Sequence, residues 1–275
     1  MHNKTFIFDL DGTLLNSNES ISQRTVESIK KIFEMGSFII IASGRMYKST
    51  RLIVEKYMPF LHNNIPIVSY NGAYVVSHTG EVVFESDILK DLAIKVIEDL
   101  KKHDTHVQIY LNDDLITDKD NDEIKQYAKH SGVEYKIVKD IVEHIKQHGE
   151  PTKILAINQP EKLDIIQKSM TEKYGNTLNI VRSFSIYLDF LNKDSSKGLA
   201  LKKLKEIYRF NLEEAYIFGD SENDISMLSL SKNSYAMANA NEHVKESARN
   251  ITLSNDEEGV AIVLEKIISN FSNSN

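Results

Sequence analysis

The chain has 275 residues, of which 41% are hydrophobic and 27% are charged, a composition that excludes wholesale disorder, collagen and a coiled coil. Lys and Arg number 33 against 40 Asp and Glu, so the formal net charge is −7, which argues against a protein that binds nucleic acid through a basic surface. Because there is no cysteine, a disulfide framework, a thiolate metal site and a Cys nucleophile are excluded.

The first part of the chain, about residues 1–82, alternates short apolar strands with helical segments. The runs Thr5–Phe8, Phe38–Ala42 and Ile65–Ser69 are almost continuously apolar, which is typical of strands buried on both faces of a parallel sheet. Between the first two runs, Ser22 is a candidate helix N-cap, and Gly36 is placed to end that helix.

The middle of the chain, about residues 83–190, differs in composition and in hydrophobic pattern. It is rich in Lys, Asp and His, with alternating patches at His106–Leu111 and Ile186–Phe190 and helical periodicity in Leu89–Leu100 and Leu163–Tyr174. These patterns predict a mixed α+β domain inserted between two halves of one core domain, 1–82 and 191–275.

The last part of the chain returns to the pattern of the first. Ser195 or Ser196 can cap a helix, and Gly259–Ile268 predicts a final amphipathic helix, followed by a polar, frayed tail over 269–275. Two more buried strands are predicted between them, at Ala215–Phe218 and Tyr235–Met237. Both ends together predict an α/β fold, a doubly wound, mostly parallel Rossmann-like core with a large inserted domain.

Two acids follow the first predicted strand. Asp9 and Asp11 stand two residues apart in Asp9-Leu10-Asp11-Gly12-Thr13, at the carboxyl end of the strand, where open α/β sheets bind ligands. A buried carboxylate needs a cation or a basic partner, and oxygen ligands without a nearby His or Cys suit Mg²⁺. The alternative is an ordinary Asp-Gly turn.

Two weaker signals involve groups that can bind an anion. Ser43-Gly44-Arg45 follows the second strand and offers a hydroxyl, a flexible backbone N–H and a cation to a phosphate oxyanion; a helix N-cap is the alternative. Lys197 precedes Gly198 at a predicted helix start, where a lysine opposes the helix dipole unless an anion lies between them; a solvated surface lysine is the alternative.

The fourth signal is the acidic loop after the strand Ala215–Phe218. It reads Gly219-Asp220-Ser221-Glu222-Asn223-Asp224, and repulsion among its acids would be unfavourable without a cation. An acidic helix N-terminus is the alternative, which explains Asp220 poorly. Because the carboxyl ends of parallel strands share one edge of a sheet, the four signals converge on one constellation suited to phosphoryl transfer.

With these four motifs, the chain resembles the haloacid dehalogenase (HAD) superfamily, in its Cof-type branch, subclass IIB, which carries a large C2-type cap domain. The resemblance covers the whole chain, and the spacing of 154 positions from Ser43 to Lys197 is too long for a capless member. Asn71-Gly72-Ala73 and Ala238-Asn239-Ala240 also look like that branch. One departure is Ser221-Glu222, where the first position is often glycine.

The resemblance implies a Mg²⁺-dependent phosphatase acting on small phosphorylated metabolites, such as sugar phosphates or phosphorylated cofactors. It implies that Asp9 is the nucleophile that becomes an aspartyl phosphate and that Asp11 is the general acid and base. Thr13 would buttress the first loop. The implied metal ligands are Asp9, Asp11 (through its backbone carbonyl), Asp220 and Asp224, the last through water or from outside the ligand shell. The implied phosphate and substrate contacts are Ser43, Gly44, Lys197, Asn223, Arg45 and Asn71.

Several alternatives stay open at this stage. A phosphomutase would use the same motifs and return the phosphoryl group to a sugar. A non-enzymatic switch phosphorylated on aspartate, like a receiver domain, and a degenerate sugar-phosphate binding protein fit less well. On the insertion, Lys153 and Arg182 are possible anion contacts, although an exposed, solvated cation is the favoured interpretation of each. His144 and His148 are favoured as a solvated helix face.

No segment has the character of a signal peptide or a membrane span. Asp9 interrupts the first apolar run after Phe8, and Phe38–Ala42 is far shorter than the roughly 20 residues that a spanning helix needs. We therefore expect a cytoplasmic protein with no membrane or nucleic-acid partner. Whether it is a monomer or a weak homodimer stays open.

Overall fold

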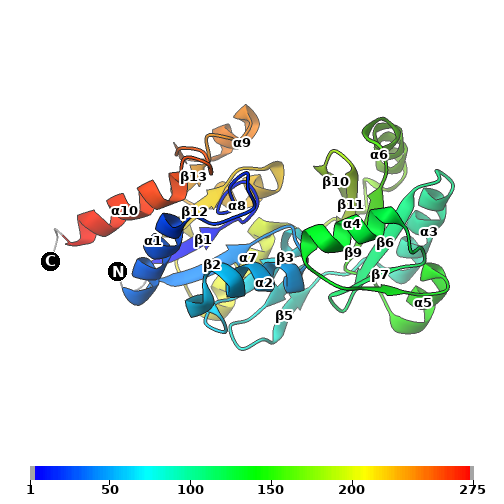
Figure 1. Ribbon diagram of the computed structural model, residues 1–275, viewed down its shortest axis with the longest axis horizontal. Coiled ribbons are helices and arrows are strands. Elements are labelled where there is room, and N and C mark those ends of the chain that lie inside the picture. Colours follow the sequence, from blue (N-terminus) through cyan, green and yellow to red (C-terminus); the bar gives the residue numbers. More distant parts are fainter. Residues whose placement is uncertain (1–3, 273–275) are drawn as a thin grey trace. The chain divides into compact units, whose positions relative to one another are not determined.

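The computed structural model describes residues 4–272 and divides them into two compact units. The core unit comprises 4–44, 50–84 and 196–272, and the inserted unit comprises 45–49 and 85–195. The predicted α/β class is confirmed: each unit has its own sheet with helices packed on it (Figure 1).

The core unit is built on an eight-stranded sheet with the strand order β14-β13-β12-β1-β2-β3-β4-β5. The pairings from β14 through β3 are parallel, and β4 runs antiparallel to β3. The strands are β1 (Thr5–Phe8), β2 (Phe38–Ala42), β3 (Ile67–Ser69), β4 (Tyr74–Val76), β5 (Val82–Glu85), β12 (Tyr216–Gly219), β13 (Asn233–Ala236) and β14 (Asn250–Ile251). The helices are α1 (Gln23–Glu34), α2 (Tyr47–Tyr57), α7 (Lys197–Tyr208), α8 (Ile225–Leu228), α9 (Glu242–Ser247) and α10 (Gly259–Ser272).

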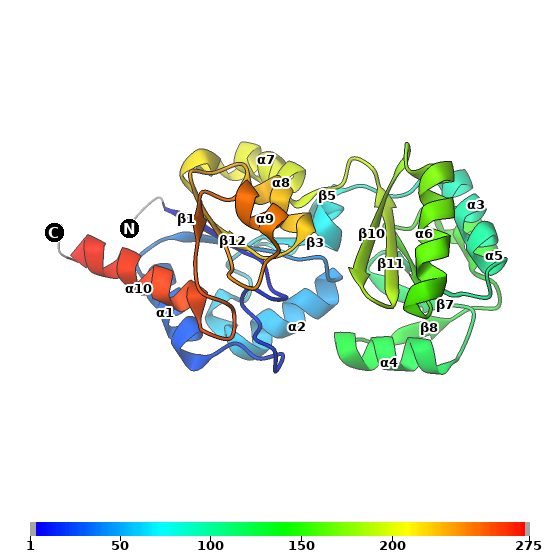
Figure 2. The ribbon, with the colours of Figure 1, turned by 90° about the horizontal axis from the view of Figure 1, so that it is seen from above.

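Alternate residues of the central strands are buried in two different apolar clusters. Phe6 and Phe8 of β1 pack with α1 and α10 on one face, whereas Ile7 packs with α7 and α8 on the other. Figure 2 shows the sheet lying between these two helix layers. This double burial is the reason that the strands are continuously apolar in sequence.

Local signals account for the ends of several helices. Ser22 Oγ accepts a hydrogen bond from the Thr25 amide at 3.2 Å and caps α1, and Ser196, rather than Ser195, caps α7. The prediction of a frayed tail is wrong for 269–272, because α10 continues to Ser272; residues 273–275 lie outside the described part of the chain.

The inserted unit is a six-stranded sheet with the order β10-β11-β9-β6-β7-β8, antiparallel except between β7 and β8. Its strands are β6 (His106–Leu111), β7 (Asp114–Thr117), β8 (Tyr135–Ile137), β9 (Lys153–Ile157), β10 (Leu178–Phe184) and β11 (Tyr187–Asn192). Its helices are α3 (Lys90–Lys101), α4 (Asp122–Ser131), α5 (Ile141–His148) and α6 (Pro160–Tyr174). Apolar residues of α3, α5 and α6 share one cluster with one face of this sheet.

The interpretation of Lys153 as an exposed cation is wrong. Lys153 is 5% exposed, and its ammonium lies 2.6 Å from Asp189, on the next-but-one strand along the chain. Arg182 lies on β10 and pairs with Asp164 at 2.6 Å. None of the helices within residues 4–272 has both the length and the apolar character needed to cross a bilayer.

Candidate active site

The first loop brings Asp9 to the end of β1, beside β12. Asp9 is 4% exposed, and its amide donates to the Phe218 carbonyl at 3.1 Å. Three residues later, Gly12 has φ +76°, and a Cβ there would lie 2.2 Å from Asp220 Oδ2. Glycine is therefore required both for the backbone turn and for the close approach of Asp220 to the first loop.

Lys197 is fully buried at the start of α7, so the solvated-lysine interpretation is wrong. Its Nζ lies 2.6 Å from Asp9 Oδ1 and 2.6 Å from Asp224 Oδ1. The following Gly198 allows this reach, because a Cβ there would lie 2.2 Å from the Ser226 carbonyl. The Lys-Gly pair thus lets α7 pack closely on the segment after Asp224.

The acidic loop after β12 holds two carboxylates in different roles. Asp224 is fully buried, and its Oδ2 accepts the amides of Asp220 and Ser221 at 2.9 and 3.0 Å. Asp220 Oδ1 accepts from Thr13 Oγ1 at 2.9 Å, which ties the two loops together. Each of Asp9, Asp220 and Asp224 offers an oxygen within 4.8 Å of those of the others.

This cluster carries more negative than positive charge. Burial raises the pKa of Asp9 well above its usual range, and the neighbouring carboxylates add to this against the opposing effect of Lys197. Burial and Asp224 raise the pKa of Asp220 to about 6. For Lys197, burial alone would lower the pKa, but the charges of Asp224 and Asp9 outweigh it and raise the pKa. Three carboxylates surround one ammonium, so a further cation could balance the remaining negative charge.

A group of polar residues lies beside Asp224. Ser43 is buried at the end of β2, and its carbonyl accepts the Asn71 amide at 3.1 Å. Asn223 Nδ2 donates to Asn71 Oδ1 at 2.7 Å, and a Cβ on Gly44 would lie 2.7 Å from that same oxygen. Asn223 Oδ1 is buried with no hydrogen-bond partner in the structure, which leaves a polar atom here for a ligand to satisfy.

The remaining predicted site residues are Asp11 and Arg45. Asp11 is half-buried and close enough to Asp9 to raise the pKa of that carboxyl. Arg45 groups with the inserted unit, where its Nη1 donates to Ser49 Oγ at 3.5 Å. The structure thus brings together Asp9, Asp11, Asp220, Asp224 and Lys197, and, through Asn223, the group of Ser43, Gly44 and Asn71.

One residue in contact with this cluster had no predicted role. Asn239 follows β13, and its Nδ2 donates to the Gly12 carbonyl at 2.9 Å and contacts Asp220 Oδ2 at 3.4 Å. The sequence marked it only by the Ala-Asn-Ala triplet, since an exposed asparagine in a loop has no periodicity or charge that points to a role.

A comparison with models of protein families shows the family of this chain. A family model described as haloacid dehalogenase-like hydrolase matches residues 6–264, with all four motifs inside the match. The chain belongs to this family. Asp9, Asp220, Asp224 and Lys197 all lie within the matched residues.

Individual relatives match over nearly the whole chain. A Bacillus subtilis protein named 5-amino-6-(5-phospho-D-ribitylamino)uracil phosphatase is 28% identical over 290 residues, which cover 97% of this chain and 98% of the relative. A crystal structure of a Thermotoga maritima protein is 38% identical, with a TM-score of 0.86 and 97% of each chain covered. A haloacid dehalogenase-like hydrolase from Bacteroides thetaiotaomicron has a TM-score of 0.87 at 28% identity, covering 96% of this chain and 99% of that one.

Proposed function

We propose that this HAD-like hydrolase is a Mg²⁺-dependent phosphatase of small phosphorylated metabolites that works through an aspartyl-phosphate intermediate. The observation that carries the proposal is the buried cluster in which Lys197 bridges Asp9 and Asp224 while Asp220 lies within reach of both. The relative named as a phosphatase, which matches over almost the full length, supports the reaction class.

The donor set fits a divalent cation. Carboxylate and carbonyl oxygens are the ligands that Mg²⁺ prefers. Burial, together with the neighbouring carboxylates, raises the pKa values of Asp9 and Asp220, and a bound cation would oppose this effect. Asp9, Asp220 and the Asp11 carbonyl would hold the ion. Asp224 would act from outside the ligand shell, because its oxygens already accept from Lys197 and two backbone amides. When bound, Mg²⁺ offsets the repulsion between the Asp9 carboxylate and a phosphate dianion.

The chain's own residues account for the two half-reactions. In the first, an Asp9 oxygen bonds to phosphorus, the bond from phosphorus to the ester oxygen breaks, and Asp11 gives its proton to the departing alkoxide. In the second, Asp11 takes a proton from water, the water oxygen bonds to phosphorus, and the bond to Asp9 breaks, so that inorganic phosphate leaves.

The neighbours of Asp9 would stabilise the transferring group. Lys197 is in contact with the nucleophile in the structure, so its ammonium is placed to neutralise a phosphoryl oxygen beside Asp9. Ser43, the Gly44 N–H and Asn223 would donate to the other oxygens, while Arg45 and Asn71 would contact the substrate. We assign recognition of the rest of the substrate to the inserted unit as a cap, with the boundaries 83–190 that the sequence predicts.

The test is a phosphate-release screen of phosphorylated metabolites, with Mg²⁺ and with EDTA, on the wild type and on Asp9→Asn. We expect release by the wild type that EDTA abolishes, and none by Asp9→Asn, because an amide cannot form the covalent intermediate. The wild type should also yield a phosphoenzyme that hydroxylamine cleaves. Unchanged melting of Asp9→Asn, measured by circular dichroism, would exclude simple unfolding.

Two results would contradict this proposal. Near-normal turnover by Asp9→Ala would remove the covalent mechanism. Rapid isomerisation of a hexose phosphate primed with bisphosphate, with negligible phosphate release, would identify a phosphomutase instead.

A further inference from the structure

Asn239 connects three segments of the core unit at one point. Its Nδ2 donates to the Gly12 carbonyl and contacts Asp220 Oδ2, and its Oδ1 accepts the Asn255 amide at 3.2 Å. The first segment is the loop after β1, the second is the acidic loop after β12, and the third is the turn before α10. The side chain of Asn239 is exposed, so it makes these contacts outside the apolar core.

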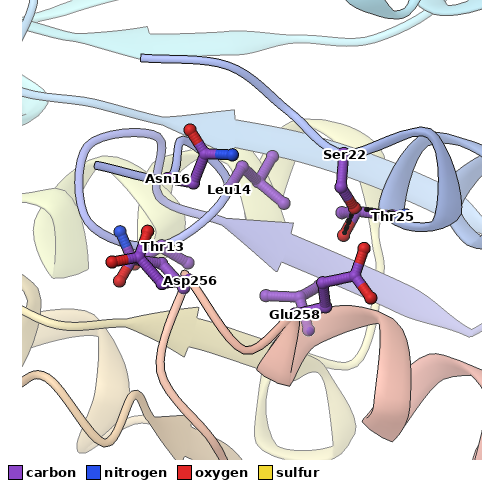
Figure 3. Close-up of a pocket in the computed structure, with 9 residues that line it drawn as sticks. Thr13, Leu14, Asn16, Ser22, Thr25, Asp256 and Glu258 are labelled. Carbon is purple, nitrogen blue, oxygen red and sulfur yellow. Dashed lines mark hydrogen bonds between the residues drawn. The ribbon is translucent and has the colours of Figure 1, made fainter. Parts of the chain in front are cut away.

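The turn before α10 makes further contacts with the first loop. Asn255 Nδ2 donates to the Leu15 carbonyl at 2.9 Å, and Asp256 Oδ1 accepts the Ser17 amide at 2.7 Å. Between the loop and the turn lies a pocket of about 210 Å³. Figure 3 shows Thr13 and Asn16 on its loop side. Asn255 and Asp256, whose hydrogen bonds join the two segments, also line this pocket.

We propose that Asn239, anchored by Asn255, is a positioning residue that holds Asp220 in its metal-binding orientation. Asp220 is otherwise oriented by Thr13 through Oδ1 and by its own neighbour Ser221 through Oδ2, at 3.2 Å. Among residues 4–272, Asn239 is the side chain that joins the Oδ2 side of this carboxylate to the backbone of the loop that carries the nucleophile. Groups that orient metal ligands in this way typically change metal affinity by 10–100-fold when removed.

This inference rests on the proposed function, because it assumes that Asp220 holds Mg²⁺. The experiment therefore measures metal binding directly, by isothermal titration calorimetry of Mg²⁺ into the full chain without substrate, and separately by the Mg²⁺ dependence of turnover. We expect Asn239→Ala to raise the Mg²⁺ dissociation constant by roughly 10–100-fold. At saturating Mg²⁺, kcat should recover to near the wild-type value.

The matched control is Asn233→Ala, at the opposite end of β13. Asn233 Nδ2 also donates to a backbone carbonyl, that of Glu214, at 3.0 Å, but far from the acidic cluster along the strand. It should leave Mg²⁺ affinity unchanged. Asn255→Ala keeps the backbone amide that donates to Asn239 Oδ1 and removes only the side-chain hydrogen bond to the Leu15 carbonyl, so it should weaken Mg²⁺ binding less than Asn239→Ala.

The outcomes separate the two proposals. A wild type that binds no Mg²⁺ would overturn the proposed function and this inference together. A wild type that binds Mg²⁺ with the same affinity as Asn239→Ala would overturn the inference alone. Equal weakening by Asn239→Ala and Asn233→Ala would also overturn it, because a general loosening of β13 would then explain both.

Discussion

Two lysines are buried within residues 4–272, one in each unit, and the surroundings of the two differ. Lys197 of the core unit and Lys153 of the inserted unit are 0% and 5% exposed. Each has its ammonium 2.6 Å from a buried aspartate, Asp9 and Asp189 respectively. The two lysines therefore have the same pair distance and are buried to a similar degree.

The two lysines differ in the number of carboxylates around them. Lys153 meets one, on a neighbouring strand of the same sheet, and its Nζ also lies 5.1 Å from the centre of the Tyr110 ring. Lys197 meets two, with Asp220 within 4.8 Å of both. One ammonium balances one carboxylate in the inserted unit, whereas the core cluster keeps surplus negative charge. That surplus, rather than burial of a charged side chain, indicates where a cation would bind.

The largest expected effect comes from Lys197→Met. It would remove the ammonium beside the nucleophile, and we expect kcat/KM to fall by roughly 10²–10³-fold or more, the typical loss when one group that stabilises an oxyanion is removed. Steady-state phosphate release at saturating Mg²⁺ measures this. The control is Lys153→Met, whose folded fraction should keep turnover close to that of the wild type. An equal fall of kcat/KM in both variants would contradict the proposed difference between the two lysines.

The second prediction concerns stability in the inserted unit. Lys153→Met leaves Asp189 buried without its counter-ion, and we expect the free energy of unfolding to fall by about 3–5 kcal/mol. Adding Asp189→Leu should restore most of the loss, because a buried ion pair replaced by apolar residues is often neutral. Urea unfolding monitored by circular dichroism gives these values. If the double variant were as unstable as Lys153→Met alone, loss of the counter-ion would not explain the destabilisation, and the two side chains would stabilise the fold through other contacts as well.

The parts of the fold that the sequence predicts best are those where burial is strongest. The bounds of β1 and β2 match the apolar runs Thr5–Phe8 and Phe38–Ala42, because strands covered on both faces have few polar positions. The strand β13 was placed two residues late. Its first two residues, Asn233 and Ser234, are polar but satisfied, since Ser234 Oγ donates to the Ser231 carbonyl at 3.1 Å.

The residues of the candidate site also differ in how well the sequence predicts them. The carboxylates of Asp9 and Asp220 were predictable because topology alone brings the ends of parallel strands to one edge of a sheet. The partner of Lys153 was not, because Asp189 lies on a different strand and only the sheet order brings the two together. The role of Asn239 could not be predicted either, because its contacts come from two loops and a turn whose paths no sequence periodicity describes.

The smallest expected effect, on the melting temperature, concerns a carboxylate whose charged neighbours are acids. Asp87 lies in the inserted unit, and burial raises its pKa to about 6, with Glu85 and Glu150 adding to this against a hydrogen bond from Thr152. Above pH 6 the carboxyl is ionised in both the folded and the unfolded chain, so the folded chain carries the full cost. As the pH falls from about 6 towards 3.8, the folded chain takes up the proton first and that cost disappears.

Asp87→Asn should therefore raise the melting temperature at pH 8 by about 2–4 °C, the shift that roughly 1 kcal/mol produces in a chain of this size. Partial solvation of the carboxyl keeps the gain below that of a fully buried charge. The gain should vanish near pH 4. The exposed Asp194→Asn is the control, and melting curves at intervals between pH 4 and 8 provide the measurement. A gain that did not depend on pH would show that packing, rather than an unbalanced charge, makes Asp87 unfavourable, and would limit the charge argument to the cluster around Lys197.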